Sequence, residues 1–281
     1  MTLNNTVWSH AGLTFEGFSR AGVGTCYLIR ELNVVVDVGY GPAFALHAPT
    51  YLITHGHMDH AVGIPYIIGQ KSLYGEKPGV FFMPPSLVKP MDEILKIWST
   101  VDGFKTNYQL RAVLPGEEIH LSRDYFVRPF PTVHRVESVG YTIFRKVKKL
   151  KPEFSGRSDN ELVAAKDQGY EITHEVEENL VSFSGDTQIE FLDQTPEVKK
   201  SKILFLEVSY LDDRQPIAKA RQWGHIHWQE VVPRLREFEN EKVVLVHLSR
   251  KYGVKEFRQL LETQLPADLK DRFVIFAPAE N

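Results

Sequence analysis

Residues 54 to 60 read Thr-His-Gly-His-Met-Asp-His, which places three imidazoles and one carboxylate within six consecutive positions. Imidazole nitrogen and carboxylate oxygen are ligands that zinc and similar divalent ions prefer. In an extended turn alternate side chains point the same way, so His55 and His57 can bind one ion while Asp59 and His60 face a second. The stretch therefore predicts a metal site. A solvent-exposed histidine-rich loop is the alternative, which the apolar residues directly before and after the stretch disfavour.

Four side chains cannot complete two metal sites, so further ligands must come from other parts of the chain. His134, Asp186 and His247 each end a strand-like apolar run. Polar residues at the ends of buried strands are often site residues in α/β proteins. Each of the three, taken alone, could equally be a hydrogen-bonded core histidine or a turn aspartate.

Short β-branched and aromatic runs predict buried strands, and longer segments with apolar residues at i, i+3, i+4 and i+7 predict helices. Mixed strands and helices in this order favour a layered α/β architecture in one domain over residues 1–281. The most plausible excursion from the body is 159–169. The predicted strands are 34–38, 51–54, 80–83, 125–130, 141–147 and 203–206, and the predicted helices are 91–101, 228–238 and 254–265.

The composition is that of an ordinary globular protein, with 43% hydrophobic and 25% charged residues. No signal peptide or membrane-spanning run is visible, and the single Cys26 favours a reducing cytoplasm. A net charge of −3 argues against nucleic-acid binding by the whole surface. It leaves room for a local patch, and the best candidates for RNA phosphate contact are Arg145, Lys146, Lys148, Lys149 and Lys151.

Taken in order, these residues resemble the ligand set of the metallo-β-lactamase superfamily. The pattern is His-x-His-x-Asp-His at 55–60, then the lone His134, then Ser-Gly-Asp-Thr at 184–187, then a strand that ends in His247. The resemblance implies an αββα sandwich of two mixed β-sheets with helices on both outer faces. It also implies two metals at one edge of the sheets.

Three further motifs narrow the resemblance to the RNase Z group, closest to its short plant-type form. Glu207 lies in Phe-Leu-Glu-Val-Ser-Tyr at 205–210, and His225 lies in Gly-His-Ile-His at 224–227. Residues 246–252, Val-His-Leu-Ser-Arg-Lys-Tyr, resemble a third motif in which the family shows His-Phe/Ile-Ser-x-Arg-Tyr. This likeness implies trimming of tRNA 3′ ends, with precursor tRNA as substrate and a homodimer without a membrane partner.

The resemblance also implies a role for each site residue. One metal would be held by His55, His57 and His134, the other by Asp59, His60 and His247, with Asp186 bridging the two. Glu207 and His225 would form a pair for proton transfer, and Asp37 would orient the histidine loop without touching metal. The imidazole count favours two Zn²⁺ ions, although Mn²⁺ or Fe²⁺ also suits such ligands.

This chemistry explains why a phosphodiesterase needs both metals and a proton donor. Two ions about 3.5 to 4 Å apart activate a bridging water and clamp the oxygens of an in-line displacement. The ribose 3′ oxygen is a poor leaving group, and His225 could protonate it if Glu207 favours the imidazolium. Asp59 could accept a proton from the attacking water.

One departure from the family bears on how RNA is held. Many relatives carry a long tRNA-binding arm between the positions of His134 and Asp186, and here a short excursion at about 146–175 is predicted in its place.

Trp223 and Trp228 flank His225. Their pattern favours core positions over base-stacking platforms.

Three other functions remain open from the sequence. The same metals could serve a phosphodiesterase for small diesters or cyclic nucleotides, or a lactonase or thioesterase, or the fold could serve binding alone. The pair Glu207 and His225 disfavours acyl transfer, because a good leaving group needs no such donor. Seven filled ligand positions disfavour a protein that only binds.

Overall fold

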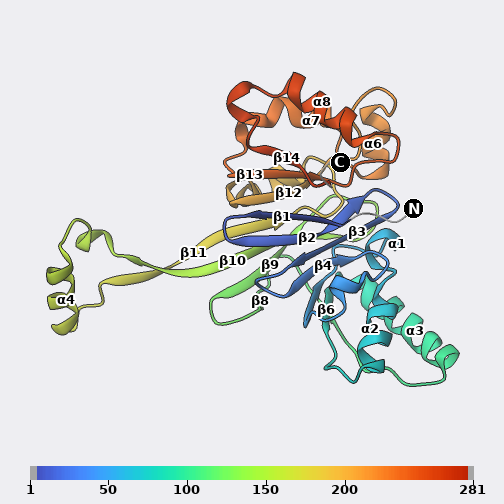
Figure 1. The fold of residues 1–281 in the computed structure, drawn as a ribbon, viewed down its shortest axis with the longest axis horizontal. Helices are drawn as coiled ribbons and strands as arrows, with labels where there is room; N and C mark the ends of the chain where they lie inside the picture. The colour runs from blue at the N-terminus through green and yellow to red at the C-terminus, as the bar shows by residue number, and fades with distance from the viewer. Residues whose placement is uncertain (1–4, 278–281) are drawn as a thin grey trace.

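The computed structural model describes residues 5–277, which form two seven-stranded β-sheets with helices outside them (Figure 1). The first sheet has its strands in sequence order. They are β1 (Thr6–His10), β2 (Leu13–Arg20), β3 (Gly24–Ile29), β4 (Val34–Val38), β5 (Thr50–Leu52), β6 (Val80–Met83) and β7 (Gln109–Ala112).

The second sheet runs in the reverse order, from β14 at one edge to β8 at the other. Strands β8 to β11 pair antiparallel and strands β11 to β14 pair parallel, so the sheet is mixed. They are β8 (Ile119–His120), β9 (Tyr125–Pro131), β10 (Val139–Leu150), β11 (Thr173–Phe183), β12 (Ile203–Glu207), β13 (Lys242–Val246) and β14 (Phe273–Ile275).

Helices cover the outer face of each sheet (Figure 1). Those of the N-terminal half lie on the first sheet, and those of the C-terminal third lie on the second. The α-helices are α1 (Met58–Ala61), α2 (Ile64–Leu73), α3 (Pro85–Asp102), α4 (Asp159–Asp167), α5 (Phe191–Gln194), α6 (Ile217–Trp223), α7 (Trp228–Val231) and α8 (Val254–Gln264). Short 3₁₀ helices are η1 (Ala43–Ala45), η2 (Pro152–Phe154), η3 (Pro196–Lys200), η4 (Val232–Glu237) and η5 (Ala267–Leu269).

Three apolar layers hold the sandwich together, and strand alternation explains how. In β4, Val34 and Val36 pack between the two sheets, whereas Val35 packs outward beneath the helices. Val38 also packs outward, because the strand is irregular at Asp37, whose φ is 52°. A strand that is apolar on both faces can only lie between two layers, and β4 is buried along its whole length. The predicted αββα sandwich is therefore confirmed.

One predicted helix is only partly right. The segment 228–238 forms a single α-helical turn, α7, and then continues as the 3₁₀ helix η4. Pro233 explains the change, because its ring removes a backbone donor and clashes with the preceding turn of an α-helix.

The segment at about 146–175, predicted as a short excursion, projects well beyond the body of the protein (Figure 1). Strands β10 and β11 continue as a two-stranded ribbon beyond the sheet and end in a tip that carries α4 (Figure 1). Among residues 5–277, β11 is the only strand that pairs with β10 from Lys146 to Leu150, which gives the ribbon roughly 15 Å of unsupported length. Phe154, Ala165 and Ile172 form a small apolar core at the tip. We call residues 146–175 the arm.

In the described part of the chain, no helix is both long and apolar enough to cross a membrane.

Candidate metal centre

The loops that follow four strands meet at one edge of the sandwich and bring the predicted ligands together. The segment after β5 supplies four of these side chains, His55 and His57 from a loop and Asp59 and His60 from α1. His134 follows β9, Asp186 follows β11 and His247 follows β13. Their ligand atoms fall into two neighbouring groups, in each of which all atoms lie within 4.8 Å of one another.

The first group consists of His55, His57, His134 and Asp186. His134 Nε2 lies 3.2 Å from His57 Nδ1, and His55 Nε2 lies 3.6 Å from Asp186 Oδ2. All four ligand atoms therefore lie close enough together to bind one ion.

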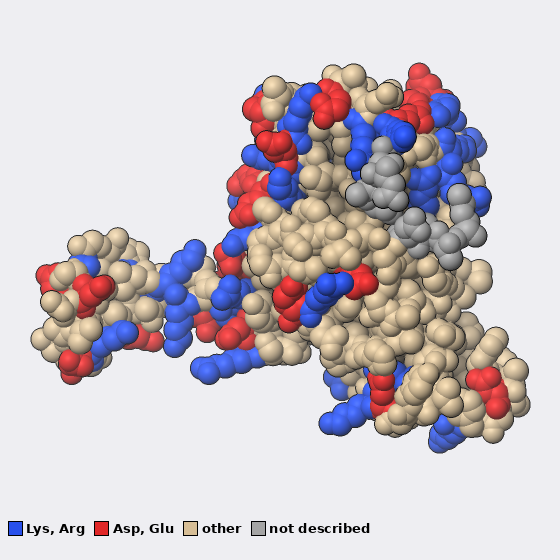
Figure 2. Space-filling model, in the orientation of Figure 1, with Lys and Arg blue, Asp and Glu red and all other residues tan. Residues whose placement is uncertain are grey.

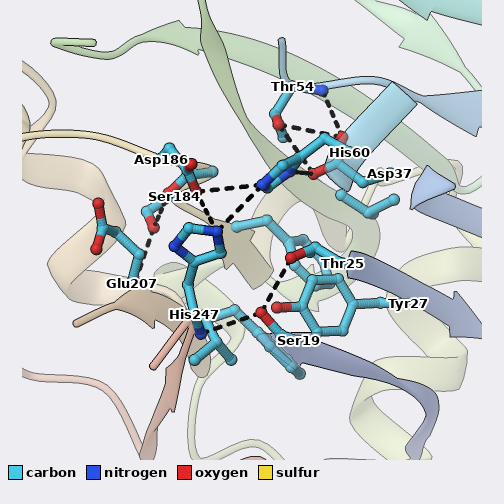
Figure 3. A pocket seen from close by; sticks show the side chains of 15 residues that line it. Ser19, Thr25, Tyr27, Asp37, Thr54, His60, Ser184, Asp186, Glu207 and His247 are labelled. Atoms are coloured by element: carbon cyan, nitrogen blue, oxygen red, sulfur yellow. Dashed lines mark hydrogen bonds and ion pairs between the residues drawn. The ribbon is translucent and has the colours of Figure 1, made fainter. Parts of the chain in front are cut away.

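The second group consists of Asp59, His60 and His247, and Asp186 of the first group lies beside it. His60 Nε2 lies 3.3 Å from His247 Nε2, which lies 3.5 Å from Asp59 Oδ2. Asp186 Oδ1 is 3.4 Å from both of these imidazole nitrogens. Because Asp186 turns Oδ2 to one group and Oδ1 to the other, its carboxylate has the arrangement of a bridge between two ions. Figure 3 shows Asp186 facing His60 and His247 of the second group.

The residues present fit divalent metal ions. The buried Nε2 of His55 has no hydrogen-bond partner, which is costly unless another ligand satisfies it. Two ligands of one tetrahedral zinc, each about 2.0–2.1 Å from the metal, lie roughly 3.3–3.4 Å apart. The facing nitrogens of His57 with His134, and of His60 with His247, stand close to that spacing.

Protonation states also suit metal binding. Burial lowers the pKa of His55, His57 and His134, which leaves these imidazoles neutral with a free lone pair. Burial would raise the pKa of Asp186, but the neighbouring His247 and His60 outweigh it and hold the group ionised. The pKa of Asp59 is likewise held low, against burial, by its hydrogen bond to His247 and by the charge of His60.

His60 carries a proton that a metal would displace. Burial would lower the pKa of His60, but the carboxylates of Asp186 and Asp37 outweigh burial and raise it well above its usual range. In the protonated imidazole both nitrogens carry a proton. The proton on Nδ1 is donated to Asp37, and the other lies on Nε2, which faces His247 and Asp186. Binding of a cation there releases that proton, so the affinity of this site for metal is coupled to pH.

Several polar groups hold the histidines in place from behind. His60 Nδ1 donates to Asp37 Oδ2 at 2.7 Å, and Thr54 donates its backbone N–H to Asp37 Oδ1 at 2.8 Å (Figure 3). His247 Nδ1 lies 3.0 Å from Ser209 Oγ. Asp37 and His247 both adopt left-handed backbone conformations, at φ 52° and 60°, which are uncommon for non-glycine residues and cluster at functional sites.

A carboxylate–imidazole pair stands beside the two groups. His225 Nδ1 donates to Glu207 Oε1 at 2.9 Å, and Glu207 is almost completely buried at the end of β12. Burial would lower the pKa of His225, but Glu207 outweighs it and raises the pKa to about 9. Before metal binds, the imidazolium form therefore dominates at neutral pH.

Sequence reasoning missed two residues that hold this centre together. Thr54 Oγ1 donates to Asp37 Oδ2 at 2.9 Å and lies 3.0 Å from His55 Nδ1. Ser209 Oγ lies 3.0 Å from Glu207 Oε2 as well as beside His247. Both stand next to predicted site residues in sequence, and that proximity is the one signal that could have found them.

The basic cluster does not belong to this centre, because Lys146 to Lys151 lie on the arm. Side chains alternate along β10, so the basic residues divide between the two faces of the ribbon. The opposing strand carries glutamates, and Lys146 Nζ pairs with Glu175 at 3.6 Å. Figure 2 accordingly shows blue side chains along the neck of the arm with red ones among them.

Comparison with known proteins agrees with this fold and site. The family model described as a beta-lactamase superfamily domain matches residues 47–248. Among solved structures, the metallo-beta-lactamase fold protein YhfI from Bacillus subtilis has a TM-score of 0.63 at 16% identity, covering 94% of this chain and 95% of that one. The short form of human tRNase Z has a TM-score of 0.57 at 17% identity, covering 83% and 92%. The fold and the site thus define a metal-dependent hydrolase of the beta-lactamase superfamily.

Sequence comparison is more specific. The chain is 34% identical to tRNase Z TRZ1 of Arabidopsis thaliana, over 93% of this chain and 94% of that protein. It is 31% identical to the chloroplastic tRNase Z TRZ2 of the same plant, over 87% of this chain and 70% of that protein. The chain belongs to the tRNase Z family.

Proposed function

We propose that this protein is a tRNA 3′-processing endoribonuclease that cleaves precursor tRNA with two divalent metal ions, of which Zn²⁺ is the preferred kind. The observation that carries the proposal is the buried pair of Glu207 and His225 beside the two ligand groups. A phosphodiester of RNA has a poor alkoxide leaving group, and this pair supplies what such a substrate needs and what an activated ester does not.

The seven ligand residues would hold the two ions as the sequence predicts. His55, His57 and His134 would bind one, Asp59, His60 and His247 the other, and Asp186 both. When bound, the ions supply a reactive water at neutral pH and neutralise charge on the phosphate. Asp59, which the hollow at the centre exposes on one side, would accept the proton of the attacking water.

His225 would complete the reaction as the general acid. Its Nδ1 is engaged with Glu207, so Nε2 is the nitrogen left to deliver a proton to the departing ribose 3′ oxygen. Glu207 is fixed in turn by the backbone N–H of Thr187, which donates to Oε1 at 3.1 Å, and by Ser209. The pair is thus oriented before substrate arrives, which limits the reorganisation needed in the transition state.

The arm would guide RNA to this centre through its lysines. Lys148 and Lys149 are exposed, and neither has a carboxylate within ion-pairing distance among residues 5–277. Replacing both by glutamate is expected to weaken precursor tRNA binding and to lower the slope of log Kd against log salt by about 2. Cleavage of bis(p-nitrophenyl) phosphate should stay at the wild-type rate.

The control for the arm variant is Lys89→Glu with Lys200→Glu, which makes the same charge change on exposed lysines of the body. Filter binding at several salt concentrations separates the two variants. Equal weakening by both would mean that net charge, and not the arm, governs RNA binding.

A homodimer is proposed because α3 exposes an apolar face. Ile94, Ile97, Trp98 and Val101 lie at helical i, i+3, i+4 and i+7 spacing, and all four are exposed. Apolar surface gathered in this way marks a protein interface. Ile97→Glu with Trp98→Glu is expected to convert a dimer into a monomer, measured by size-exclusion chromatography with light scattering. Val163→Glu on the arm, which replaces an equally exposed apolar residue, should leave the mass unchanged.

The test of the proposed function uses metal-loaded protein and two substrates. One is precursor tRNA with a 3′ trailer, and the other is bis(p-nitrophenyl) phosphate. Removal of the trailer is the expected result. Turnover of the small diester without trailer removal would instead favour a small-molecule or cyclic-nucleotide phosphodiesterase. The cytoplasmic localisation predicted from the sequence stays a prediction.

A further inference from the structure

Trp223 is a large aromatic side chain exposed at the mouth of the metal centre. It is the last residue of α6 and is 46% exposed, whereas Trp228, five residues later, is fully buried. The core position favoured from the sequence is therefore right for Trp228 and wrong for Trp223. Trp223 lines the same hollow as His57, Asp59 and His225.

The segment that carries Trp223 is pinned against the metal centre. Gly224 accepts a hydrogen bond of 2.8 Å from His134 Nδ1 through its carbonyl oxygen. Its φ of +77° is left-handed, and a Cβ at this position would lie 2.6 Å from the same His134 atom. Only glycine fits this close approach, so the backbone between Trp223 and His225 is held in a fixed place beside a candidate ligand.

The indole is also held from one side by an arginine. The guanidinium carbon of Arg135 lies over the Trp223 ring, 4.6 Å from its centroid. Arg135 is exposed, and no carboxylate among residues 5–277 lies within ion-pairing distance of it. A cation over one face of an indole orients the ring and leaves the other face for a further flat group.

We propose that Trp223 is a stacking platform for the nucleobase immediately 5′ of the scissile phosphate, a proposal that rests on the function proposed above. The leaving 3′ oxygen belongs to the nucleoside on that side of the phosphate, and His225 must touch this oxygen to protonate it. Trp223 stands two residues from His225 on the same rim of the hollow, so the base of that nucleoside is the one within its reach. Stacking on indole tolerates any of the four bases.

The kinetic test combines a protein change with a substrate change. Trp223→Ala is expected to lower kcat/KM for precursor tRNA roughly 5- to 150-fold, mainly through KM, because stacking is present before and during the reaction. Trp223→Phe should recover most of this loss. Precursor tRNA with an abasic residue 5′ of the cleavage site should cost the wild type the same factor, and Trp223→Ala should then cost nothing more.

A binding measurement separates this inference from the proposed function. A short RNA with 2-aminopurine at the same position is titrated with metal-loaded His225→Ala protein, in which cleavage is slow. Binding is expected to quench the fluorescence of 2-aminopurine, and the quenching should be lost in the double variant His225→Ala with Trp223→Ala. This result supports stacking even if no trailer is removed from precursor tRNA. Two results would overturn the platform while the proposed nuclease activity stands. One is fluorescence quenching that persists in the Trp223→Ala variant. The other is that removing the base and replacing Trp223 lower kcat/KM independently, so that their factors multiply.

Discussion

Replacing His225 by alanine is expected to slow cleavage of precursor tRNA by about 10²- to 10⁴-fold, with the metal content of the protein unchanged. The reason is that His225 donates to Glu207 at 2.9 Å and can deliver its other proton to the leaving oxygen. Single-turnover cleavage and elemental analysis of the purified protein measure the two quantities. Glu207→Gln, which keeps the shape of the side chain and removes its charge, should cause a smaller loss of the same kind.

A change of leaving group makes this test specific to proton donation. RNA with a 3′-bridging sulfur at the cleavage site has a thiolate leaving group that needs no proton, so His225→Ala should cleave it at close to the wild-type rate. His120→Ala, at an exposed histidine far along the sheet, is the matched control. The structure offers one rival role, because His225 also groups with Asp186 and His247 as a possible ligand set. Loss of metal from His225→Ala would favour that role and contradict the donor.

Asp186→Asn is expected to have the other large effect, because both candidate sites share this carboxylate. Its two oxygens lie 3.4 to 3.6 Å from nitrogens of His55, His60 and His247, and the side chain is buried among them. Loss of a residue that merely orients a ligand costs about 10- to 100-fold in metal affinity. Loss of a shared ligand should therefore cost more than about 100-fold, and activity should fall with the metal content.

The matched control is Asp124→Asn, which makes the same chemical change at an exposed position. Metal per chain is measured after dialysis against buffer without metal, together with the midpoint of thermal unfolding with and without added Zn²⁺. Stabilisation by zinc should be present in the control and strongly reduced in Asp186→Asn. A variant that keeps two ions per chain would contradict the assignment of Asp186 as the bridge.

Strands and ligand candidates could be predicted because their signals are local. The valine-rich run of β4 and the polar residues that follow β11 and β13 are visible in single short windows of sequence. The order of these residues then gave the family and the sandwich. Short windows of sequence do not show how the histidine rings are oriented. Which nitrogen of His57 faces the metal centre depends on His134, which is 77 residues away in sequence.

Conformations that oppose residue preference were also beyond prediction. Asp and His adopt a left-handed backbone more often than most residues but still rarely, so residue type alone does not predict it at Asp37 and His247, where the surrounding contacts impose it. The reach of the arm depends on pairing between strands that are more than twenty residues apart. Both Trp223 and Trp228 flank His225, yet α6 ends at Trp223 and leaves it exposed while α7 turns Trp228 into the core.

The most direct test of the two-metal nuclease is to identify the ends made by cleavage in ¹⁸O-labelled water. Metal-loaded protein is incubated with precursor tRNA that carries a 3′ trailer, and both products are analysed by mass spectrometry. The expected result is a tRNA product with a free 3′ hydroxyl and a trailer whose 5′ phosphate contains one ¹⁸O atom. A 2′,3′-cyclic phosphate or a 3′ phosphate on the tRNA product, or an uncut precursor, would contradict the account.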